Sequence, residues 1–175
     1  SNSATLSFVD GASDVTLDST YDEYMFVFTD IGPATDNVNL GFQVNATDDA
    51  GGGYDTSLIT STFFDAIQNE TGDGGLDVLY QASHDQAQGT AFQTIARGTG
   101  NGSDESCAGV MHLFSPASTT YVKHFYSRCN GYQYDNYTFD QFCAGYINDT
   151  TAIDEIQFKM SSGNFDGVIQ LFGIA

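Results

Sequence analysis

The chain has 175 residues, with 23 acidic and four basic side chains, a formal net charge of −19 and 41% hydrophobic residues. Four basic side chains cannot neutralise a phosphate backbone or an anionic membrane surface, so we expect neither nucleic acid nor a membrane as a partner. No stretch approaches the roughly 20 apolar residues of a membrane-spanning helix. The hydrophobic content is sufficient for a core, and the length suits one domain.

Nineteen of the acids are aspartates. Aspartate favours turns, because its short side chain bonds the nearby backbone, so the composition predicts short strands joined by polar loops. We interpret the acids as a solvating surface rather than as calcium ligands, and expect no cofactor. The weaker calcium alternative has three candidate pairs in glycine-rich loops, none matching the Asp-x-Asp-x-Asp-Gly pattern: Asp48 and Asp49, Asp73 and Asp77, and Asp104 and Glu105.

Apolar residues alternate with polar residues at period two, which is typical of half-buried strands. In chain order, this pattern predicts strands over 3–9, 23–31, 38–45, 91–97, 107–114, 120–128, 141–147, 155–160 and 167–174. Residues 23–31 are apolar at both parities, which predicts a central strand covered on both faces. Residues 115–118 predict a hairpin turn. Residues 57–67 fit either a strand or a short helix.

Eight to ten short strands separated by turn signals, with no clear helix, predict an all-β fold. We expect a single antiparallel β-sandwich of the jelly-roll type over residues 1–175. Residues 1–10 are predicted to hold a terminal strand on a polar tether, with Leu6 and Phe8 on its apolar face. Such a strand pairs either within its own sheet, which we favour, or with the open edge of a neighbouring copy.

The sequence carries no catalytic signature. It has no Gly-x-Ser-x-Gly elbow, and the glycines of residues 98–102 lack the spacing of a dinucleotide-binding loop. His112 and His124 are expected to lie roughly opposite each other across the predicted hairpin. Two histidines do not complete a zinc site, so ordinary packing is the preferred interpretation. We therefore expect no enzyme activity.

Three cysteines allow at most one disulfide within the chain. If their strands are neighbours, Cys129 and Cys143 are the expected pair. Three buried thiols, with Cys107 as the third, are an equally weighted alternative.

Five asparagines begin an Asn-x-Ser/Thr triplet, against about two expected by chance in such a polar chain. They are candidate glycosylation sites in a producer that has the machinery: Asn45, Asn69, Asn101, Asn136 and Asn148.

Tyr132, Tyr134 and Tyr137 lie close together in the sequence, with Asp135 and Asn136 between them. Amphipathic rings suit the faces of sugars, so this stretch is a candidate glycan contact. The absence of tryptophan favours the packing of a long loop instead.

Three stretches, residues 19–43, 92–128 and 152–174, together resemble virion structural proteins of aquatic tailed bacteriophages. The resemblance extends from about residue 6 to residue 174. Its most specific parts are Tyr21-Asp22-Glu23-Tyr24, Pro33-Ala34-Thr35-Asp36 and Met160-Ser161-Ser162-Gly163-Asn164. It implies a structural role as a head decoration, fibre or tail appendage, and it supplies no catalytic or ligand-binding residues.

We therefore expect a non-enzymatic subunit of an extracellular particle. Its partners would be other copies of itself and other virion proteins, joined through edge strands and apolar patches while the acidic surface limits aggregation. Two alternatives remain open. One is a carbohydrate-binding module that recognises host-surface glycans, and the other is a subunit of a cellular filament joined by an exchanged strand.

Overall fold

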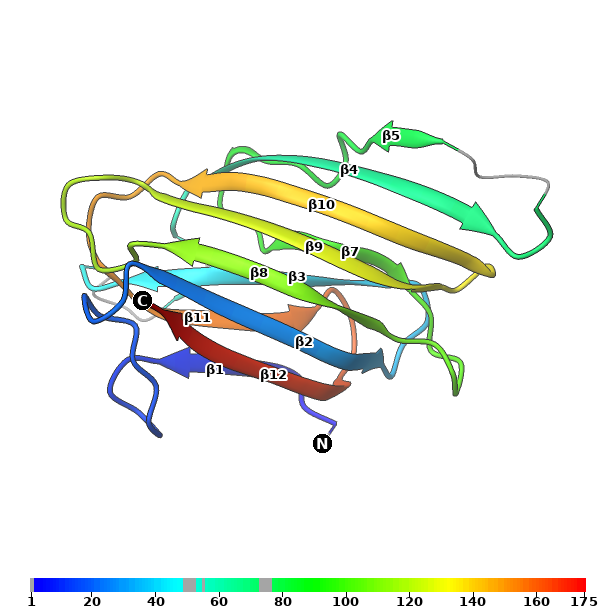
Figure 1. The fold of residues 1–175 in the computed structure, drawn as a ribbon, viewed down its shortest axis with the longest axis horizontal. Coiled ribbons are helices and arrows are strands. Elements are labelled where there is room, and N and C mark those ends of the chain that lie inside the picture. Colours follow the sequence, from blue (N-terminus) through cyan, green and yellow to red (C-terminus); the bar gives the residue numbers. More distant parts are fainter. Residues whose placement is uncertain (1, 49–52, 55, 73–76) are drawn as a thin grey trace.

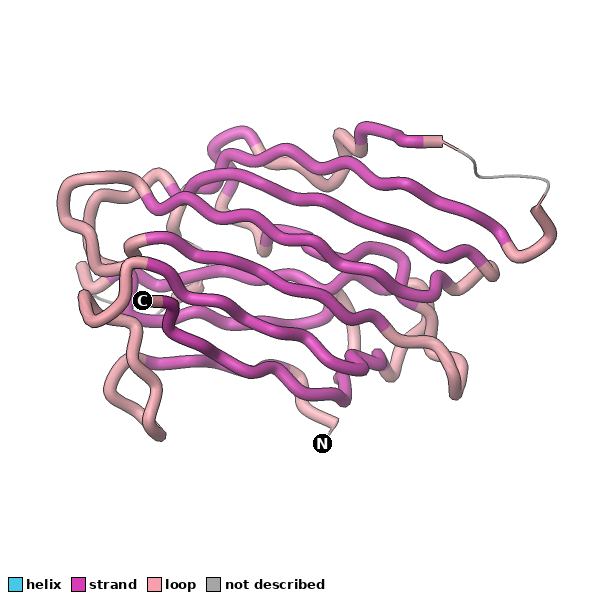
Figure 2. The backbone as a smooth tube through the Cα atoms, viewed as in Figure 1, coloured by secondary structure: helices cyan, strands magenta, loops and turns pink. Residues whose placement is uncertain are grey.

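The computed structural model describes residues 2–48, 53, 54, 56–72 and 77–175. These residues form twelve strands and no helix, and all strand pairs are antiparallel (Figures 1 and 2). The strands are β1 Thr5–Val9, β2 Glu23–Pro33, β3 Val38–Ala46, β4 Ile59–Asn69, β5 Val78–Tyr80, β6 Ala87–Gly89, β7 Gln93–Thr99, β8 Cys107–Phe114, β9 Lys123–Gln133, β10 Tyr137–Ile147, β11 Ile153–Met160 and β12 Phe165–Ile174.

The sheet has two arms. The long arm has the strand order β12-β2-β8-β9-β10-β4, with the short strands β5 and β6 both paired to β4. The short arm has the order β1-β11-β3-β7, and one residue pair, Thr99 with Gln133, joins β7 to β9. Figure 1 shows β3 and β11 passing behind β8 and β2, so the sheet folds over and its arms face each other.

The expected all-β, antiparallel fold is confirmed, and the jelly-roll connection of its strands stays a prediction. The structure has more strands than the expected eight to ten, because β5 and β6 are edge strands of three residues each, too short to show a period of two. The ambiguous segment 57–67 is the start of β4, where alternate residues from Ile59 to Asp65 are buried. The predicted hairpin of β8 and β9 is confirmed.

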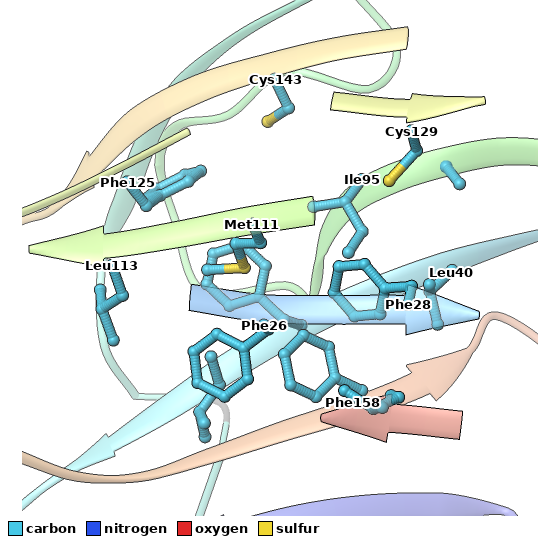
Figure 3. Close-up of a cluster of buried hydrophobic side chains, with 14 of the residues drawn as sticks. Phe26, Phe28, Leu40, Ile95, Met111, Leu113, Phe125, Cys129, Cys143 and Phe158 are labelled. Carbon is cyan, nitrogen blue, oxygen red and sulfur yellow. The ribbon is translucent and has the colours of Figure 1, made fainter. Parts of the chain in front are cut away.

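Aromatic rings from the two arms meet in the core (Figure 3). Phe158 of β11 lies 5.2 Å from Phe26 and 5.3 Å from Phe28 of β2, measured between ring centroids. Phe42 of β3 meets Phe125 of β9 edge to face at 4.9 Å. β2 is not paired with β11, nor β3 with β9, so side-chain packing holds these parts of the arms together. Each buried ring contributes about 1.5–3 kcal/mol through removal from water.

Strand β2 is central, as predicted, because it lies between β12 and β8. Its expected coverage on both faces is wrong. Tyr24, Phe26 and Phe28 are buried against the short arm, whereas Met25 and Val27 point to the opposite face and stay half-exposed. No second layer covers that face in the described part of the chain. The long arm therefore has an outer surface that carries apolar side chains.

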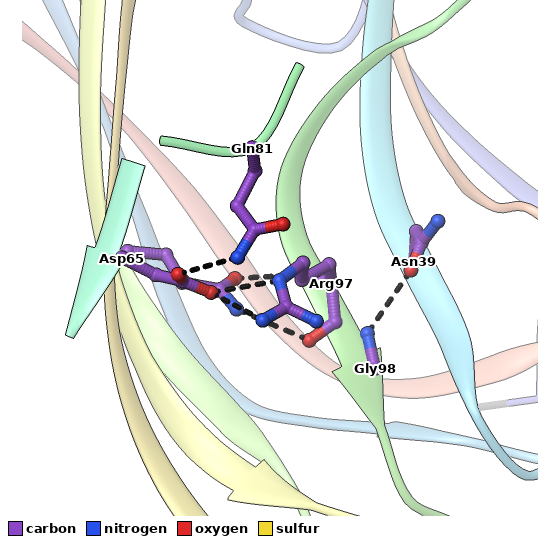
Figure 4. A network of polar contacts seen from close by, with 6 residues as sticks. Asn39, Asp65, Gln81, Arg97 and Gly98 are labelled. Carbon is purple, nitrogen blue, oxygen red and sulfur yellow. Dashed lines mark hydrogen bonds and ion pairs between the residues drawn. The ribbon is translucent and has the colours of Figure 1, made fainter. Parts of the chain in front are cut away.

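A polar network replaces the apolar core near β4 and β7 (Figure 4). The carboxylate of Asp65, fully buried on β4, accepts hydrogen bonds from Arg97 Nε at 2.7 Å and from Gln81 Nε2 at 2.9 Å. Gln141 Oε1 on β10 accepts one from the backbone amide of Arg97 at 2.7 Å. Arg97 lies on β7 of the short arm, so the ion pair joins the two arms where aromatic packing ends.

We expect Asp65→Ala to lower the free energy of unfolding by about 3–5 kcal/mol, because it leaves the Arg97 guanidinium without its carboxylate in a largely buried position. Asp140→Ala removes the partner of the exposed Arg128 and is the matched control, with an expected loss of at most about 1 kcal/mol. Urea denaturation followed by circular dichroism measures both. Equal losses in the two variants would contradict a stabilising role for the buried pair.

Candidate functional site

The outer face of the long arm carries side chains in rows that the strand register defines. One row crosses seven strands, from β12 to β5: Gln170, Val27, Val110, Arg128, Phe142, Phe64 and Tyr80. The adjacent row crosses six strands: Phe172, Met25, His112, Tyr126, Ala144 and Thr62. We call these two rows together the outer ladder. Most of its side chains are apolar or aromatic, and all come from paired strands.

Ring stacking orders one half of the outer ladder. Phe64 and Phe142 stack face to face with centroids 4.9 Å apart and planes 8° apart. The Arg128 guanidinium lies 5.1 Å from the centroid of the Phe142 ring and makes two hydrogen bonds to Asp140, at 2.9 and 2.7 Å. The faces of the Phe142 ring thus contact Phe64 and Arg128 within the ladder, so a partner protein can contact only the edge of this ring.

The other half of the ladder is centred on His112. This ring stacks on Tyr126, with centroids 4.6 Å apart, and its Nδ1 lies 2.5 Å from Glu23 Oε1. The predicted juxtaposition of His112 and His124 is wrong, because the register places His112 opposite Tyr126 and His124 opposite Tyr146. The turn between β8 and β9 is asymmetric, so similar distances from it along the chain do not give cross-strand partners.

Charge is distributed unevenly between the loops and the outer ladder. Of the acids in the described residues, thirteen lie outside the strands and seven lie within them. Three acids contact ladder residues. Asp140 is paired with Arg128, Glu23 contacts the His112 ring nitrogen, and Asp85 accepts a hydrogen bond from the Tyr80 hydroxyl. On a chain of net charge −19, the ladder is therefore a surface with few acidic side chains.

A polar hollow of about 490 Å³ lies where β4, β9 and β10 end, and we call it the Tyr132 hollow. The Tyr132 hydroxyl lies 2.9 Å from Glu70 Oε1 and 3.2 Å from Asn136 Oδ1, and the Glu70 carboxylate raises the pKa of Tyr132. The lining side chains are amides, carboxylates, hydroxyls and two small residues: Gln68, Asn69, Asn130, Glu70, Asp104, Ser106, Thr138, Tyr132, Ala108 and Gly131.

The three tyrosines do not form one platform. The register pairs Tyr132 with Thr138 and Tyr137 with Gln133, so Tyr132 and Tyr137 lie on opposite faces of the sheet. Tyr134 lies in the turn between β9 and β10, as does Asp135. The register therefore does not bring the three rings of the glycan-contact alternative onto one surface, and of the three only Tyr132 lines the hollow.

The terminal strand pairs within its own chain, the favoured alternative. Leu6 lies opposite Phe158 and Phe8 opposite Ile156 on β11. The Phe8 ring packs 5.4 Å from Phe26, measured between centroids, whereas Leu6 is 36% exposed. Apart from an isolated bridge between Ser3 and Phe165, the described residues pair no second strand with this end of the chain, so β1 keeps an open edge.

All three cysteines are free and buried, so the expected disulfide between Cys129 and Cys143 is wrong. The register explains this result, because Gln141 lies opposite Cys129 and Ser127 lies opposite Cys143. Diagonal neighbours of this kind are about 7–8 Å apart, too far for a disulfide. Burial raises the pKa of Cys107 and Cys143 to about 12.

Four of the candidate glycosylation sites lie at the surface or near it. Asn101, Asn136 and Asn148 are exposed, and Asn69 is half-buried beside the Tyr132 hollow. Asn45 is only 8% exposed on the central strand β3, so its assignment as a glycosylation site of the folded protein is wrong. The alternating sequence pattern of β3 does not predict that Asn45 is buried. The pattern places polar residues on the outer face of a strand, but a loop can cover that face.

The described residues contain no group of three or more His, Cys, Asp or Glu side chains arranged to hold a metal ion. Of the calcium candidates, Asp49 and Asp73 lie outside the described residues. Within the same residues, no helix is long and apolar enough to cross a membrane.

Sequence reasoning missed the outer ladder as a site. A signal for it was present, because residues 107–114, 120–128 and 141–147 carry large side chains at both parities, as residues 23–31 do. An apolar residue on each face of neighbouring strands predicts either a second covering layer or an exposed apolar surface. The sequence alone does not distinguish these two outcomes.

Comparisons with known proteins add little to this description. No protein-family model matches the chain. No curated protein matches it. Among solved structures, it is similar to a structural genomics protein of unknown function from Bacteroides ovatus, with a TM-score of 0.33 and 4% identity. That similarity covers 68% of this chain and 46% of the other, so the chain spans less than half of that protein.

We expect the native protein to be inert to thiol reagents at pH 8, because the thiolate form is strongly disfavoured for all three buried cysteines. Titration with a chromogenic disulfide should detect no thiol in the folded protein and three after unfolding in guanidinium without reductant. Detection of only one thiol after unfolding would instead demonstrate a disulfide.

Proposed function

We propose that the protein is a non-enzymatic structural subunit of an extracellular particle, such as a virion decoration, fibre or tail appendage. The observation that supports this proposal best is the outer ladder, an exposed apolar surface made entirely of strands. Contiguous apolar surfaces of this kind in soluble proteins usually bind other proteins. The resemblance of the sequence to phage virion proteins favours the same role.

A second copy of the same chain is the partner that the charges favour. Two molecules of net charge −19 repel each other over most of their surfaces. Contact between two outer ladders brings together surfaces with few acids, of which Asp140 is paired with Arg128. The repulsion is therefore smallest there, and a face that binds its own copy gives a two-fold symmetric contact. Other particle proteins can bind to the edges of the sheet that this contact leaves free.

The open edge of β1 provides a second contact. Its unpaired backbone groups can accept a strand from a neighbouring subunit, which extends the assembly in another direction. Because the two arms face each other, we also propose that the architecture is a β-sandwich of the jelly-roll type, which many particle subunits share. In the filament alternative, β1 itself moves to a neighbour. The packing of Phe8 against Phe26 in its own chain supports the open-edge arrangement instead.

We expect the double substitution Phe64→Ser and Tyr126→Ser to weaken self-association at least tenfold, because it removes two exposed rings from neighbouring rows of the ladder. Tyr121→Ser is the matched control, because Tyr121 is 73% exposed in a loop away from the ladder. Sedimentation velocity over a range of concentrations measures the effect, with circular dichroism as a check of folding. A wild-type protein that stays monomeric at every concentration would refute the proposed function.

Deletion of residues 1–10 should also impair assembly, because it removes Leu6 and Phe8 and uncovers the edge of β11. Electron microscopy of the deletion variant beside the full chain is the measurement. Assemblies of normal shape and number from the deletion variant would contradict a role for the terminal strand. The role of the outer ladder is tested separately by the substitutions of Phe64 and Tyr126.

A further inference from the structure

We infer that the Tyr132 hollow is a binding site for the uncharged sugar units of an oligosaccharide. This activity goes beyond assembly, because the hollow lies at the end of β4, β9 and β10, outside the two rows of the outer ladder. Its volume of about 490 Å³ lies within the roughly 300–1,000 Å³ range of small-molecule sites.

The lining excludes two other classes of ligand. No lysine, arginine or histidine lines the hollow, whereas Glu70 and Asp104 do, so phosphate, sulfate and acidic sugars are repelled. The carbon-rich side chains of the lining are the Tyr132 ring and Ala108, too few for a lipid or another apolar ligand. An uncharged ligand with many hydroxyl groups fits the remaining chemistry.

The Tyr132 ring is held in position before any ligand arrives. Its hydroxyl lies within hydrogen-bonding distance of Glu70 on one side and of Asn136 on the other. A fixed ring loses little conformational entropy on binding. Such a ring can pack against the C–H face of a sugar while its polar end stays hydrated.

Hydrogen-bond acceptors surround this ring. The Asn130 amide nitrogen donates to the carbonyl of Phe139 at 2.7 Å, and the Gln68 amide nitrogen donates to the carbonyl of Asn69 at 3.1 Å. These contacts fix the two amides, and within the described residues their oxygens accept no hydrogen bond from the protein. The amide oxygens and the Asp104 carboxylate are thus available to accept hydrogen bonds from sugar hydroxyls.

The hollow continues toward the ladder, which favours an oligosaccharide over a single sugar. A second hollow of about 380 Å³ shares Ala108 and Asn130 with the first and extends to Arg128 and Asp140. The small side chain of Ala108 keeps the passage between them open. Because the Arg128 charge is paired with Asp140, this extension is also suited to uncharged sugar units.

The test uses cellotriose, maltotriose, triacetylchitotriose and galactotriose as uncharged probes, and sialyllactose and a heparin disaccharide as acidic probes. Titrations of the full chain are followed by isothermal calorimetry and by NMR chemical shifts. We expect at least one uncharged trisaccharide to bind and neither acidic probe to do so. Binding by none of the uncharged probes, or tighter binding of an acidic probe, would overturn the inference.

Three variants locate the binding. Tyr132→Ala should weaken it at least tenfold, and Ala108→Leu, which fills the passage and retains the ring, should weaken it to a similar extent. Tyr134→Ala is the matched control, because this ring is 41% exposed in the adjacent turn and does not line the hollow. Unchanged binding in both Tyr132→Ala and Ala108→Leu would overturn the inference. None of the three changes a ladder residue, so self-association measured on the same samples tests the proposed assembly separately.

Discussion

Phe158 packs against both Phe26 and Phe28, and this contact between strands that share no backbone hydrogen bonds keeps the two arms face to face. Backbone hydrogen bonds join the arms only near their margins in the described residues, where Thr99 pairs with Gln133 and Ser3 bridges to Phe165. The buried rings hold the arms together between these margins. The arrangement of every surface feature therefore depends on the aromatic core.

The two outer surfaces of the folded-over sheet differ in how far loops cover them. On the short arm, the loops around Ser57 and Thr90 cover part of the surface, and the buried Gln43 donates hydrogen bonds to their carbonyls. On the long arm, β9 and β10 are joined by a short turn over 134–136, and the loop 115–122 between β8 and β9 leaves Tyr126 44% exposed. The outer ladder stays exposed for this reason, and its rings pack against one another rather than against a loop.

The sequence predicted the strands more accurately than the contacts between them. Alternation shows which residues of one strand share a face, so the buried positions Ile156, Phe158 and Met160 of β11 followed from it. It does not show the register between strands, which the turns determine. Each error about His112, Cys129 and Tyr137 was an error of register. Both features proposed for binding combine residues distant in the sequence, such as Phe64 with Phe142 and Glu70 with Tyr132.

The buried position of Asn45 makes the closing of the short arm incompatible with a glycan on this residue. Asn45 begins an Asn-Ala-Thr triplet, and its side chain lies on β3 between β11 and β7 with almost no contact with solvent. An oligosaccharide transferred to the unfolded chain during secretion would have to occupy this buried position, and the short arm could not close. The folded short arm therefore requires an unmodified Asn45.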